Sequence, residues 1–375
     1  MSSLRLGVVQ RVLPSYRVPV FQALARQVDL TLYVGTDPKS SLPDAAPQGL
    51  TVVPTPFRTV GPFHIQPGAL GAALARRHDV LVLPWETAYV FLVPAVLAAR
   101  ARGMKVLVWG HGYSKTERPL RRMARNAMAR LADGALFYAR PAAERCVAEG
   151  FRAERVFVAP NAQDQAPIRA ARAKWPAARL QAFIEDQGLR PARAGGDGVL
   201  IFSSRLEPDK GVDLLLEAFA ALQARRPGAQ LLIIGDGSHR AALEAQAQGL
   251  TGVRFLGAVY EEETLAGWFS AADLFAYPKA IGLSLLHACG YGLPTVTSDD
   301  EPGHNPEFVA LEPGVNGALY RDGDANDFAR VMDDLLADPA RLTALSQGAR
   351  RTAEIYTVEA MAQGFTDAAR AVLGR

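Results

Sequence analysis

Short aliphatic or β-branched runs alternate with longer stretches rich in Ala, Arg and Leu along the whole chain. Such short apolar runs are typical of strands buried on both faces, and the longer stretches have helical length. The predicted strands are 4–9, 30–34, 80–83, 105–109, 135–137, 156–159, 199–203, 230–234, 253–256, 274–277 and 295–297. The predicted helices are 19–27, 67–77, 88–102, 117–132, 141–149, 212–225, 239–248, 261–270, 284–292, 324–337, 339–354 and 358–373. This alternation predicts an α/β fold with parallel sheets covered by helices on both faces.

A stretch at 187–198, rich in Gly and Pro and without periodicity, divides the alternating pattern. We interpret it as an interdomain linker. The predicted domains are 1–190 and 197–356, each doubly wound, and a last helix at about 357–375 is expected to pack back on the first domain. Because open α/β sheets bind ligands at the carboxyl ends of their strands, the expected site is a cleft between the two domains.

The composition is that of a globular protein, with 49% hydrophobic and 21% charged residues in a chain of 375. It excludes a disordered or collagen-like chain. Cys146 and Cys289 lie in separate halves without metal-ligand spacing, which favours a reducing compartment. No apolar run reaches the ~18 residues of a membrane span, and the N-terminus does not have the pattern of a signal peptide. The sequence therefore predicts a cytoplasmic protein.

Charge is unevenly distributed along the chain. Residues 1–190 contain 26 Lys and Arg against 13 Asp and Glu, and the remainder contains 15 against 25, for a net charge of +3. Such asymmetry indicates an anionic partner for the first half, either a nucleic acid or a membrane surface. Independent evolutionary drift in the surface charge of the two halves explains the asymmetry equally well, so both interpretations stay open.

Three loops that follow predicted strands of the second half have candidate ligand-binding residues. Arg205 and Lys210 follow the strand 199–203 and precede a helix, where two cations and free amides suit a pyrophosphate. The segment from Gly235 to Ser238 permits close backbone approach to a ligand, or is an ordinary turn before a helix capped by Ser238. The segment at 257–260 has backbone donors and an aromatic face that suit a flat base, or it serves only in packing. The candidates there are Gly257, Val259 and Tyr260.

The stretch 277–294 contains the strongest combination of signals. Lys279 precedes a turn at Gly282, and a helix begins near Ser284. The free N–H groups of Gly282, Leu283 and Ser284 would hold a phosphate at this helix start. His287 lies one turn further on, within reach of a ribose; the alternative for a lone histidine among apolar neighbours is a core position.

In the first half, polar residues also follow strands. The loop after the first strand contains Arg11, Tyr16 and Arg17. Trp85 and Glu86 follow the strand 80–83, and His111 stands between two glycines after the strand 105–109. An imidazole at such a place has little to pack against, which favours a role in a site over a turn histidine bonded to local backbone.

Together these residues resemble the family-4 retaining glycosyltransferases, which have the GT-B architecture of two Rossmann-like domains facing across a cleft. The resemblance covers most of the chain and is densest at 137–317. In the second half its signals stand in the family's order: Arg-Leu and Lys-Gly at 205–211, Gly-Asp-Gly at 235–237, Val-Arg-Phe-Leu-Gly at 253–257, Gly-Leu-Ser-Leu-Leu-His-Ala at 282–288 and Gly-Leu-Pro-Thr-Val at 292–296.

The resemblance implies that a sugar moves from a nucleotide-diphosphate donor of UDP or GDP type to an acceptor hydroxyl, with retention of configuration and without a metal or other cofactor. It makes 1–190 the acceptor domain and 197–356 the donor domain. The implied catalytic residues are His111, Lys279, Arg205 and Lys210. The implied donor-binding residues are Arg205, Lys210, Gly235, Gly257, Val259, Tyr260, Gly282, Leu283, Ser284 and His287. The implied acceptor-binding residues are Arg11, Tyr16, Arg17, Trp85 and Glu86.

The sequence departs from the family at two positions. The family has two glutamates eight residues apart around the Gly-containing turn, and here Lys279 and His287 stand in their places. His287 retains the ability to bond a ribose hydroxyl, whereas a charged lysine accepts no hydrogen bond. Lys279 instead suits a carboxylate on the sugar, which leads to the hypothesis of an acidic donor sugar.

The expected acceptor is a saccharide or lipid-linked saccharide of bacterial surface polysaccharide or glycolipid synthesis. The stretch 117–130 predicts a basic amphipathic helix, which suits the inner face of an anionic membrane or is a solvated face. A sugar-nucleotide 2-epimerase and a non-catalytic nucleotide-sugar binder stay open as alternatives. A nucleic-acid partner is not expected, because no stacking-aromatic motif supports one. Asp322 and Asp324 resemble a metal-binding pair, but Asp324 is better explained as a helix N-cap, and no metal is assigned.

Overall fold

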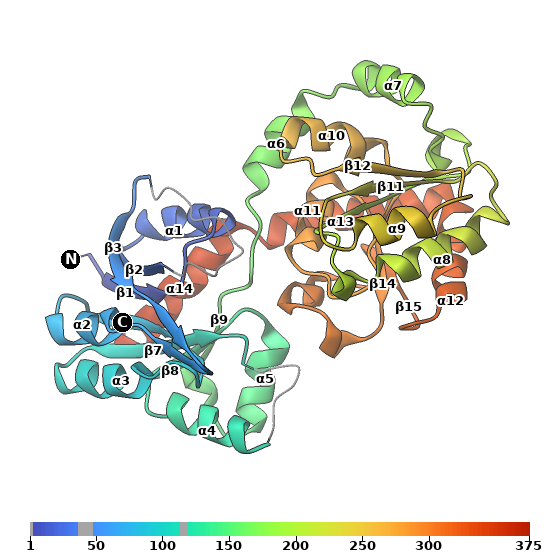
Figure 1. Cartoon of the computed structure of the whole chain (residues 1–375). Coiled ribbons are helices and arrows are strands. Elements are labelled where there is room, and N and C mark those ends of the chain that lie inside the picture. The colour runs from blue at the N-terminus through green and yellow to red at the C-terminus, as the bar shows by residue number, and fades with distance from the viewer. Residues whose placement is uncertain (1–2, 37–47, 113–118) are drawn as a thin grey trace. The chain divides into compact units, whose positions relative to one another are not determined.

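The computed structural model describes residues 3–36, 48–112 and 119–375. The chain forms two compact units (Figure 1). Unit 1 comprises residues 1–162 and 358–375, and unit 2 comprises residues 163–357. Each unit has its own parallel sheet with helices on both faces, as the alternation of apolar runs predicts.

The sheet of unit 1 has seven strands in the described residues, in the order β3-β2-β1-β6-β7-β8-β9, all parallel. The strands are β1 (Arg5–Gln10), β2 (Asp29–Thr36), β3 (Thr51–Pro56), β6 (Val80–Pro84), β7 (Lys105–Gly110), β8 (Gly134–Phe137) and β9 (Val156–Val158). A separate antiparallel pair joins β4 (Arg58–Val60) and β5 (Phe63–Ile65). The chain therefore reverses its direction of winding between β1 and β6.

Helices bury both faces of this sheet. They are α1 (Val18–Ala25), α2 (Gly68–Ala75), α3 (Leu92–Ala101), α4 (Pro119–Ala129), α5 (Arg140–Ala148) and α14 (Val358–Leu373). On one face α1 and α14 lie side by side over Leu6, Val8 and Leu107 (Figure 1). On the other face α2, α3 and α5 pack over Val9 and Val106. Successive strand residues thus belong to opposite cores, which explains the continuous apolar runs.

The sheet of unit 2 has six parallel strands in the order β12-β11-β10-β13-β14-β15. They are β10 (Val199–Ser203), β11 (Gln230–Ile234), β12 (Val253–Gly257), β13 (Leu274–Ala276), β14 (Thr295–Ser298) and β15 (Gly317–Tyr320). Numbered along the chain this order is 3-2-1-4-5-6, that of a dinucleotide-binding sheet, with its switch point between β10 and β13.

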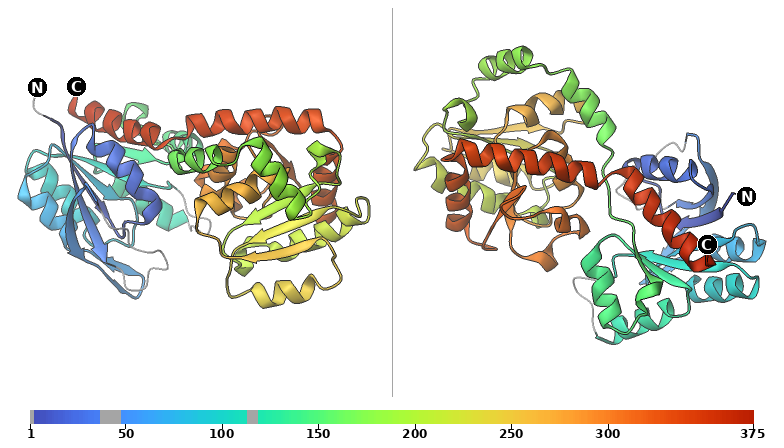
Figure 2. Two further views of the ribbon diagram at one scale, coloured as in Figure 1. Left: turned by 90° about the horizontal axis from the view of Figure 1, so that it is seen from above. Right: turned by 180° about the vertical axis from the view of Figure 1, so that it is seen from behind.

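The helices of unit 2 also form two layers. They are α6 (Gln165–Ala173), α7 (Ala177–Asp186), α8 (Val212–Gln223), α9 (Arg240–Gln246), α10 (Glu262–Ala271), α11 (Leu283–Tyr291), α12 (Ala325–Leu336) and α13 (Pro339–Ile355). Contacts group α8 with α9 and α12, and α11 with α6, α10 and α13. In the left view of Figure 2 the sheet lies between α13 and α9. The side chain of Asp324 caps α12, as predicted.

The structure differs from the sequence prediction in the boundary between the units, in the expected linker and in several elements. Residues 163–190, expected in the first domain, belong to unit 2. The expected linker 187–198 is part of that unit, because Leu189 and Ala192 are buried and the Asp273 carboxylate accepts the N–H groups of Ala192 and Val199. Strands β3, β4, β5 and β15 and helices α6 and α7 were not predicted. None of the described helices has the length and apolar character that crossing a membrane requires.

Candidate functional site

The loops that follow β10 and β13 meet at the switch point of unit 2. The hydroxyl of Tyr277, after β13, donates to Oγ of Ser204, after β10, at 3.1 Å. The side chain of Lys279 lies so close to Gly211 that a Cβ at Gly211 would stand 3.2 Å from its Cγ. The two loops in which the sequence places its candidate cations are therefore in direct contact.

Three cations of the predicted site surround this contact. Arg205 is exposed, and Lys210 and Lys279 are half-buried. Nζ of Lys210 lies 3.0 Å from Oδ2 of Asp209, whose side chain is 65% exposed. Because the Asp209 carboxylate is largely exposed to water, this ion pair has little net strength, and an incoming anion can replace Asp209 at Lys210. The structure thus brings Arg205, Lys210 and Lys279 to one sheet edge.

Two helices begin at the same place. Gly211 is the N-cap of α8 and Gly282 the N-cap of α11, and no side chain of the described residues caps either helix. Their first N–H groups are therefore available to a ligand, and the partial positive charge of each helix start favours an anion. Two uncapped helix starts and three cations suit the two phosphoryl groups of a diphosphate.

The turn before α11 is held in a constrained conformation. Ala280 has φ +52°, a region that residues with a side chain rarely occupy. The Ile281 N–H donates to Nδ1 of His304 at 3.1 Å, and the Asn305 amide donates to the Ala280 carbonyl at 3.1 Å. A Cβ at Gly282 would stand 3.0 Å from that amide. His304 and Asn305, which the sequence did not single out, therefore position the start of α11.

The Gly-Asp-Gly segment serves packing between loops. Gly235 has φ +145°, and a Cβ there would stand 1.8 Å from the Ser204 carbonyl oxygen. Ser238 does not cap α9, since its hydroxyl donates to Glu207 at 2.6 Å. The hydrogen bonds from Ser238 lower the pKa of Glu207. Glycine is thus required here because the Arg205 loop crosses it.

His287 does not present an unengaged imidazole. Its Nε2 lies 2.9 Å from Oε1 of Glu262, at the start of α10, and the hydroxyl of Tyr291 donates to the same carboxylate. Burial alone would raise the pKa of Glu262, but the hydrogen bonds from His287 and Tyr291 and the charge of His287 outweigh it, and the pKa is lowered. The side chain of Glu262 remains 28% exposed.

Sequence reasoning missed Glu262. It stands in a run of three glutamates at a helix start. Acidic residues are common there because they interact favourably with the helix N-terminus, so the run did not indicate a site. The only signal available was its place after β12, at the same sheet edge as His287. The other candidates lie at the end of β12 and in the loop that leads from β12 to Glu262. Tyr260 is 92% exposed, whereas Val259 packs against the core of the unit and the Gly257 carbonyl accepts the Gly235 N–H.

In unit 1, His111 follows β7, and its ring centroid lies 4.8 Å from that of Tyr138, after β8. The guanidinium of Arg17 lies 5.2 Å from the Tyr138 ring and 5.1 Å from the Trp109 ring. Arg17 is only 7% exposed and also contacts Met361 of α14. The expectation that Arg17 binds an acceptor is corrected: it is a core residue that supports the ring beside His111.

The remaining acceptor candidates divide in the same way. Trp85 is 3% exposed and packs against Phe137, so it too is a core residue and offers no surface to an acceptor. Glu86 is exposed next to it, and Tyr16 is half-buried. Arg11 lies over the ring of Phe57 at 5.9 Å. Arg11, Tyr16 and Glu86 thus lie in loops after β1 and β6, at the switch point of unit 1.

Residues 197–338, which lie wholly in unit 2, match the sequence model of the family described as Glycosyl transferases group 1. The chain is 30% identical over 181 residues to a GDP-mannose-dependent monoacylated alpha-(1-6)-phosphatidylinositol monomannoside mannosyltransferase of Corynebacterium glutamicum, which covers 45% of this chain and 46% of the relative. It is 32% identical over 188 residues to a D-inositol 3-phosphate glycosyltransferase of Thermobispora bispora, which covers 45% and 43%. The chain thus spans less than half the length of these curated relatives.

Solved structures match almost the whole chain. A glycosyltransferase from Rickettsia africae has a TM-score of 0.74 at 13% identity, covering 100% of this chain and 99% of the other. HepE of Anabaena, solved in complex with UDP, has a TM-score of 0.70 at 17% identity, covering 97% and 99%. At such identities the likeness shows the fold alone. The predicted fold is confirmed: the chain has two doubly wound α/β domains of the GT-B type.

Proposed function

We propose that the chain is a glycosyltransferase that moves a sugar from a nucleotide-diphosphate donor to an acceptor hydroxyl. The observation that carries this proposal is the meeting of Arg205, Lys210 and Lys279 with the uncapped starts of α8 and α11 at one switch point. The family match in unit 2 and the sugar-transferring activities named for the relatives support it.

In this proposal the donor lies along the carboxyl edge of the unit 2 sheet. Arg205, Lys210 and the N–H groups of 282–284 take up the charge of the departing diphosphate, so that no metal is needed. Glu262, oriented by His287 and Tyr291, accepts hydrogen bonds from the ribose hydroxyls. Tyr260 offers its exposed ring to the base.

In this proposal Lys279 contacts the reacting sugar at this edge of unit 2, and His111, after β7 in unit 1, has the catalytic role that the resemblance implies. We propose that the reaction retains the anomeric configuration, as the resemblance to family 4 implies. Catalysis is then mainly positioning and charge stabilisation. The loss of one cationic contact to the leaving group raises the barrier by ~2–4 kcal/mol, by analogy with an oxyanion donor.

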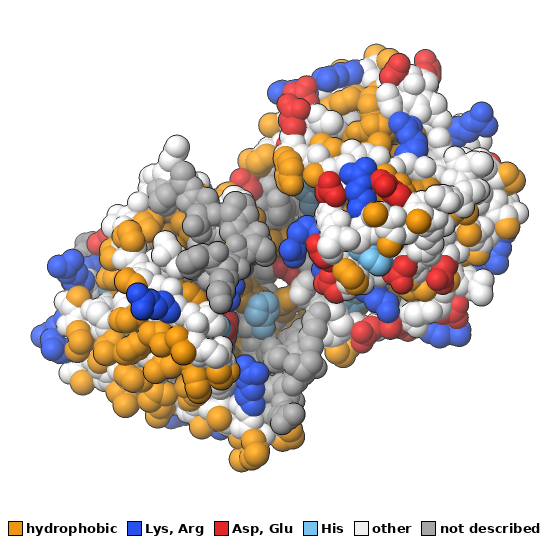
Figure 3. All heavy atoms as spheres, viewed as in Figure 1, with side chains coloured by type: hydrophobic (Ala, Val, Ile, Leu, Met, Phe, Trp, Pro, Cys, Tyr) orange, Lys and Arg blue, Asp and Glu red, His pale blue; other side chains and the backbone are white. Residues whose placement is uncertain are grey.

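We also propose a saccharide or lipid-linked acceptor at a membrane surface. Unit 1 contains 23 Lys and Arg against 12 Asp and Glu, whereas unit 2 contains 18 against 26. In Figure 3 the visible face of unit 1 has a hydrophobic area with scattered basic side chains around it, and that of unit 2 mixes both signs. A basic and partly apolar surface favours an anionic bilayer. This supports a cytoplasmic protein that attaches to the inner face of the membrane.

The test is donor binding followed by turnover. Thermal shifts with UDP, GDP, UDP-glucose and GDP-mannose identify the nucleotide, since a ligand of the folded state raises the melting temperature. R205Q and K210Q should each weaken binding of the preferred nucleotide at least tenfold. R341Q, which removes an exposed arginine at the start of α13, is the matched control and should bind as the wild type does. Unchanged binding by both R205Q and K210Q would refute the site.

A second function is favoured by Lys279 and His287, which stand where the family has glutamates. A non-catalytic nucleotide-sugar binder would give the same thermal shifts, but would release no nucleoside diphosphate from the sugar nucleotide with any acceptor. An epimerase would release nucleotide and an epimerised sugar without an acceptor. Product analysis on the wild type therefore separates the three.

A further inference from the structure

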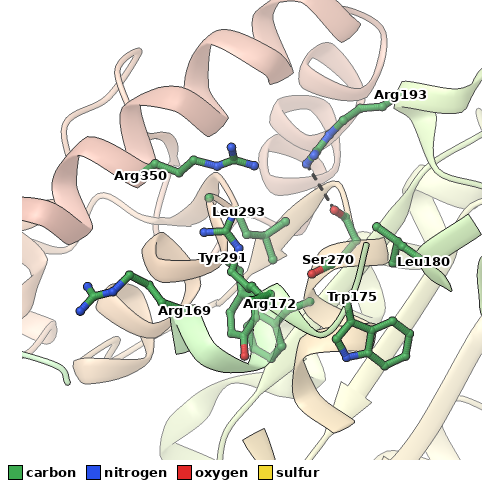
Figure 4. Close-up of a pocket in the computed structure, with 13 residues that line it drawn as sticks. Arg169, Arg172, Trp175, Leu180, Arg193, Ser270, Tyr291, Leu293 and Arg350 are labelled. Atoms are coloured by element: carbon green, nitrogen blue, oxygen red, sulfur yellow. Dashed lines mark hydrogen bonds between the residues drawn. The ribbon is translucent and has the colours of Figure 1, made fainter. Parts of the chain in front are cut away.

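A cavity of unit 2, of about 510 Å³, lies at the sheet edge opposite to the candidate donor site. Helices α10 and α11 begin at the donor edge and end beside this cavity, at Ala271 and Tyr291. Helices α6 and α13 and the 3-10 helix η3 (Ala192–Ala194) complete its wall (Figure 4). Its volume is within the range of small-molecule sites.

Arginines dominate the lining. Arg169, Arg172, Arg193 and Arg350 line the cavity, and its described lining includes no Asp or Glu. Figure 4 shows the side chains of Arg193 and Arg350 extending toward each other from opposite sides, while Arg169 points away. Asp273 lies just outside the lining. Its Oδ1 is 3.4 Å from Nε of Arg193, so its carboxylate balances the charge of that arginine. The cavity therefore keeps a positive excess.

Part of this charge has a structural use. Arg172 donates to the Gly290 carbonyl at 3.0 Å, and Arg193 donates to the Ala272 carbonyl at 3.3 Å, so each satisfies the end of a helix. A guanidinium has five N–H donors, and these contacts leave others available. Arg350 has no hydrogen-bond or ion-pair partner within the described part of the chain. Among the described residues, Arg350 therefore does not satisfy a carbonyl at a helix end as Arg172 and Arg193 do.

The backbone leaves room for Arg350. A Cβ at Gly292 would stand 2.5 Å from its Nε, so the side chain lies directly against this glycine. Burial, and next the charge of Arg350, lower the pKa of Arg172. Burial lowers the pKa of Arg193 as well. The charge of Asp273 acts to raise this pKa, and the charge of Arg350 acts to lower it further. Arg350 therefore repels both neighbours, and an anion between them would relieve that repulsion.

We propose that this cavity binds a small phosphorylated ligand, its phosphate groups held by Arg172, Arg193 and Arg350. Arginine forks match phosphate oxygens in pairs, and a doubly charged phosphate balances the excess better than a single carboxylate does. Trp175, Leu180 and Leu293 form an apolar wall for the body of the ligand. This site is separate from the candidate donor site and does not depend on the proposed function.

The test is isothermal titration with inorganic pyrophosphate at constant ionic strength. The protein is the full chain with the R205Q and K210Q substitutions, which weaken pyrophosphate binding at the other candidate phosphate site. In this background R350Q should weaken pyrophosphate binding at least tenfold. R351Q removes the next arginine of α13, which is exposed and outside the cavity, and should leave the affinity unchanged.

Melting temperatures without ligand show whether each variant is folded, and both arginines are exposed, so folding should persist. A second variant, R172K, keeps a charge but loses the fork, and should weaken binding in the same direction. Absence of pyrophosphate binding, or equal affinities for R350Q and R351Q, would overturn the proposal.

Discussion

Nε2 of His287 and Oε1 of Glu262 lie 2.9 Å apart, and they join the second turn of α11 to the start of α10, two helices that follow different strands. The pair stands where the resemblance places a single glutamate. A carboxylate is therefore present at this edge after all, supplied by α10 instead of α11. Its lowered pKa means that it is charged across the physiological range.

This relationship predicts a pH dependence of stability. Because the folded-state pKa of Glu262 is below its ordinary value of 4.5, the carboxylate stabilises the fold above that value, and the stabilisation is lost as the pH falls through the folded-state pKa. E262Q should therefore be less stable than wild type at about pH 6, and the difference should shrink at about pH 4. Urea unfolding at both pH values measures it.

The control is E261Q, which removes the neighbouring exposed carboxylate. It should change the free energy of unfolding little at either pH. If E262Q differs from wild type by the same amount at both pH values, the Glu262 carboxylate is not stabilised by His287 and Tyr291. The proposed ribose contact adds a second readout: E262Q should bind the preferred nucleotide more weakly, whereas E261Q should not.

Gly235 should tolerate no side chain. An alanine there would adopt an unfavourable φ of +145° and place its Cβ 1.8 Å from the Ser204 carbonyl oxygen. We expect G235A to lose more than about 3 kcal/mol of stability, since strain and overpacking add. G249A is the control: its φ is +91°, but nothing lies within 4 Å of the added Cβ, and strain alone costs about 1 kcal/mol. Equal losses in urea unfolding would show that the crossing of the loops is not what requires glycine.

The sequence predicted β10 and β11 of unit 2 well because almost all their residues are buried, but it missed β15 at the edge of the same sheet. The runs 199–203 and 230–234 coincide with β10 and β11. It missed β3, where Pro54 and Pro56 stand in an edge strand that needs few ladder hydrogen bonds. It misread 187–198 because the contact that fixes this stretch, between Ala192 and Asp273, joins residues 81 positions apart in the sequence.

The candidate site was predictable in its loops but not in its individual contacts. Strand ends supplied Arg205, Lys210 and Lys279, since the carboxyl edge of a parallel sheet follows from strand order. Which side chains face a ligand depends on packing. Arg17 is buried because α14, far along the chain, covers it through Met361, and no local pattern reveals this.

Lys279 is predicted to decide the charge of the donor sugar. Its stem packs against Gly211 beside the loop of Lys210, so its ammonium lies near the proposed leaving group and transferred sugar. We expect the wild type to prefer an acidic donor such as UDP-glucuronic acid over UDP-glucose, and K279A to lose this preference. Initial rates with both donors measure it. Equal use of the two donors by wild type and by K279A would remove the hypothesis.

Helix α4 should contribute to membrane attachment. Leu120 is 80% exposed and Met123 is 65% exposed on a helix that also contains Arg121 and Arg122, and the rest of the predicted segment, at 117–118, lies outside the described residues. Apolar insertion and attraction to anionic lipid then act together. Replacing Leu120 and Met123 by serine should reduce flotation with phosphatidylglycerol vesicles several-fold, and added salt should weaken the binding of the wild type.

The control for this prediction is L97S, which removes a leucine of α3 that is 54% exposed in the structure. If wild type does not float with anionic vesicles, or floats equally after the double substitution, α4 is a solvated helix and the acceptor must be reached without it.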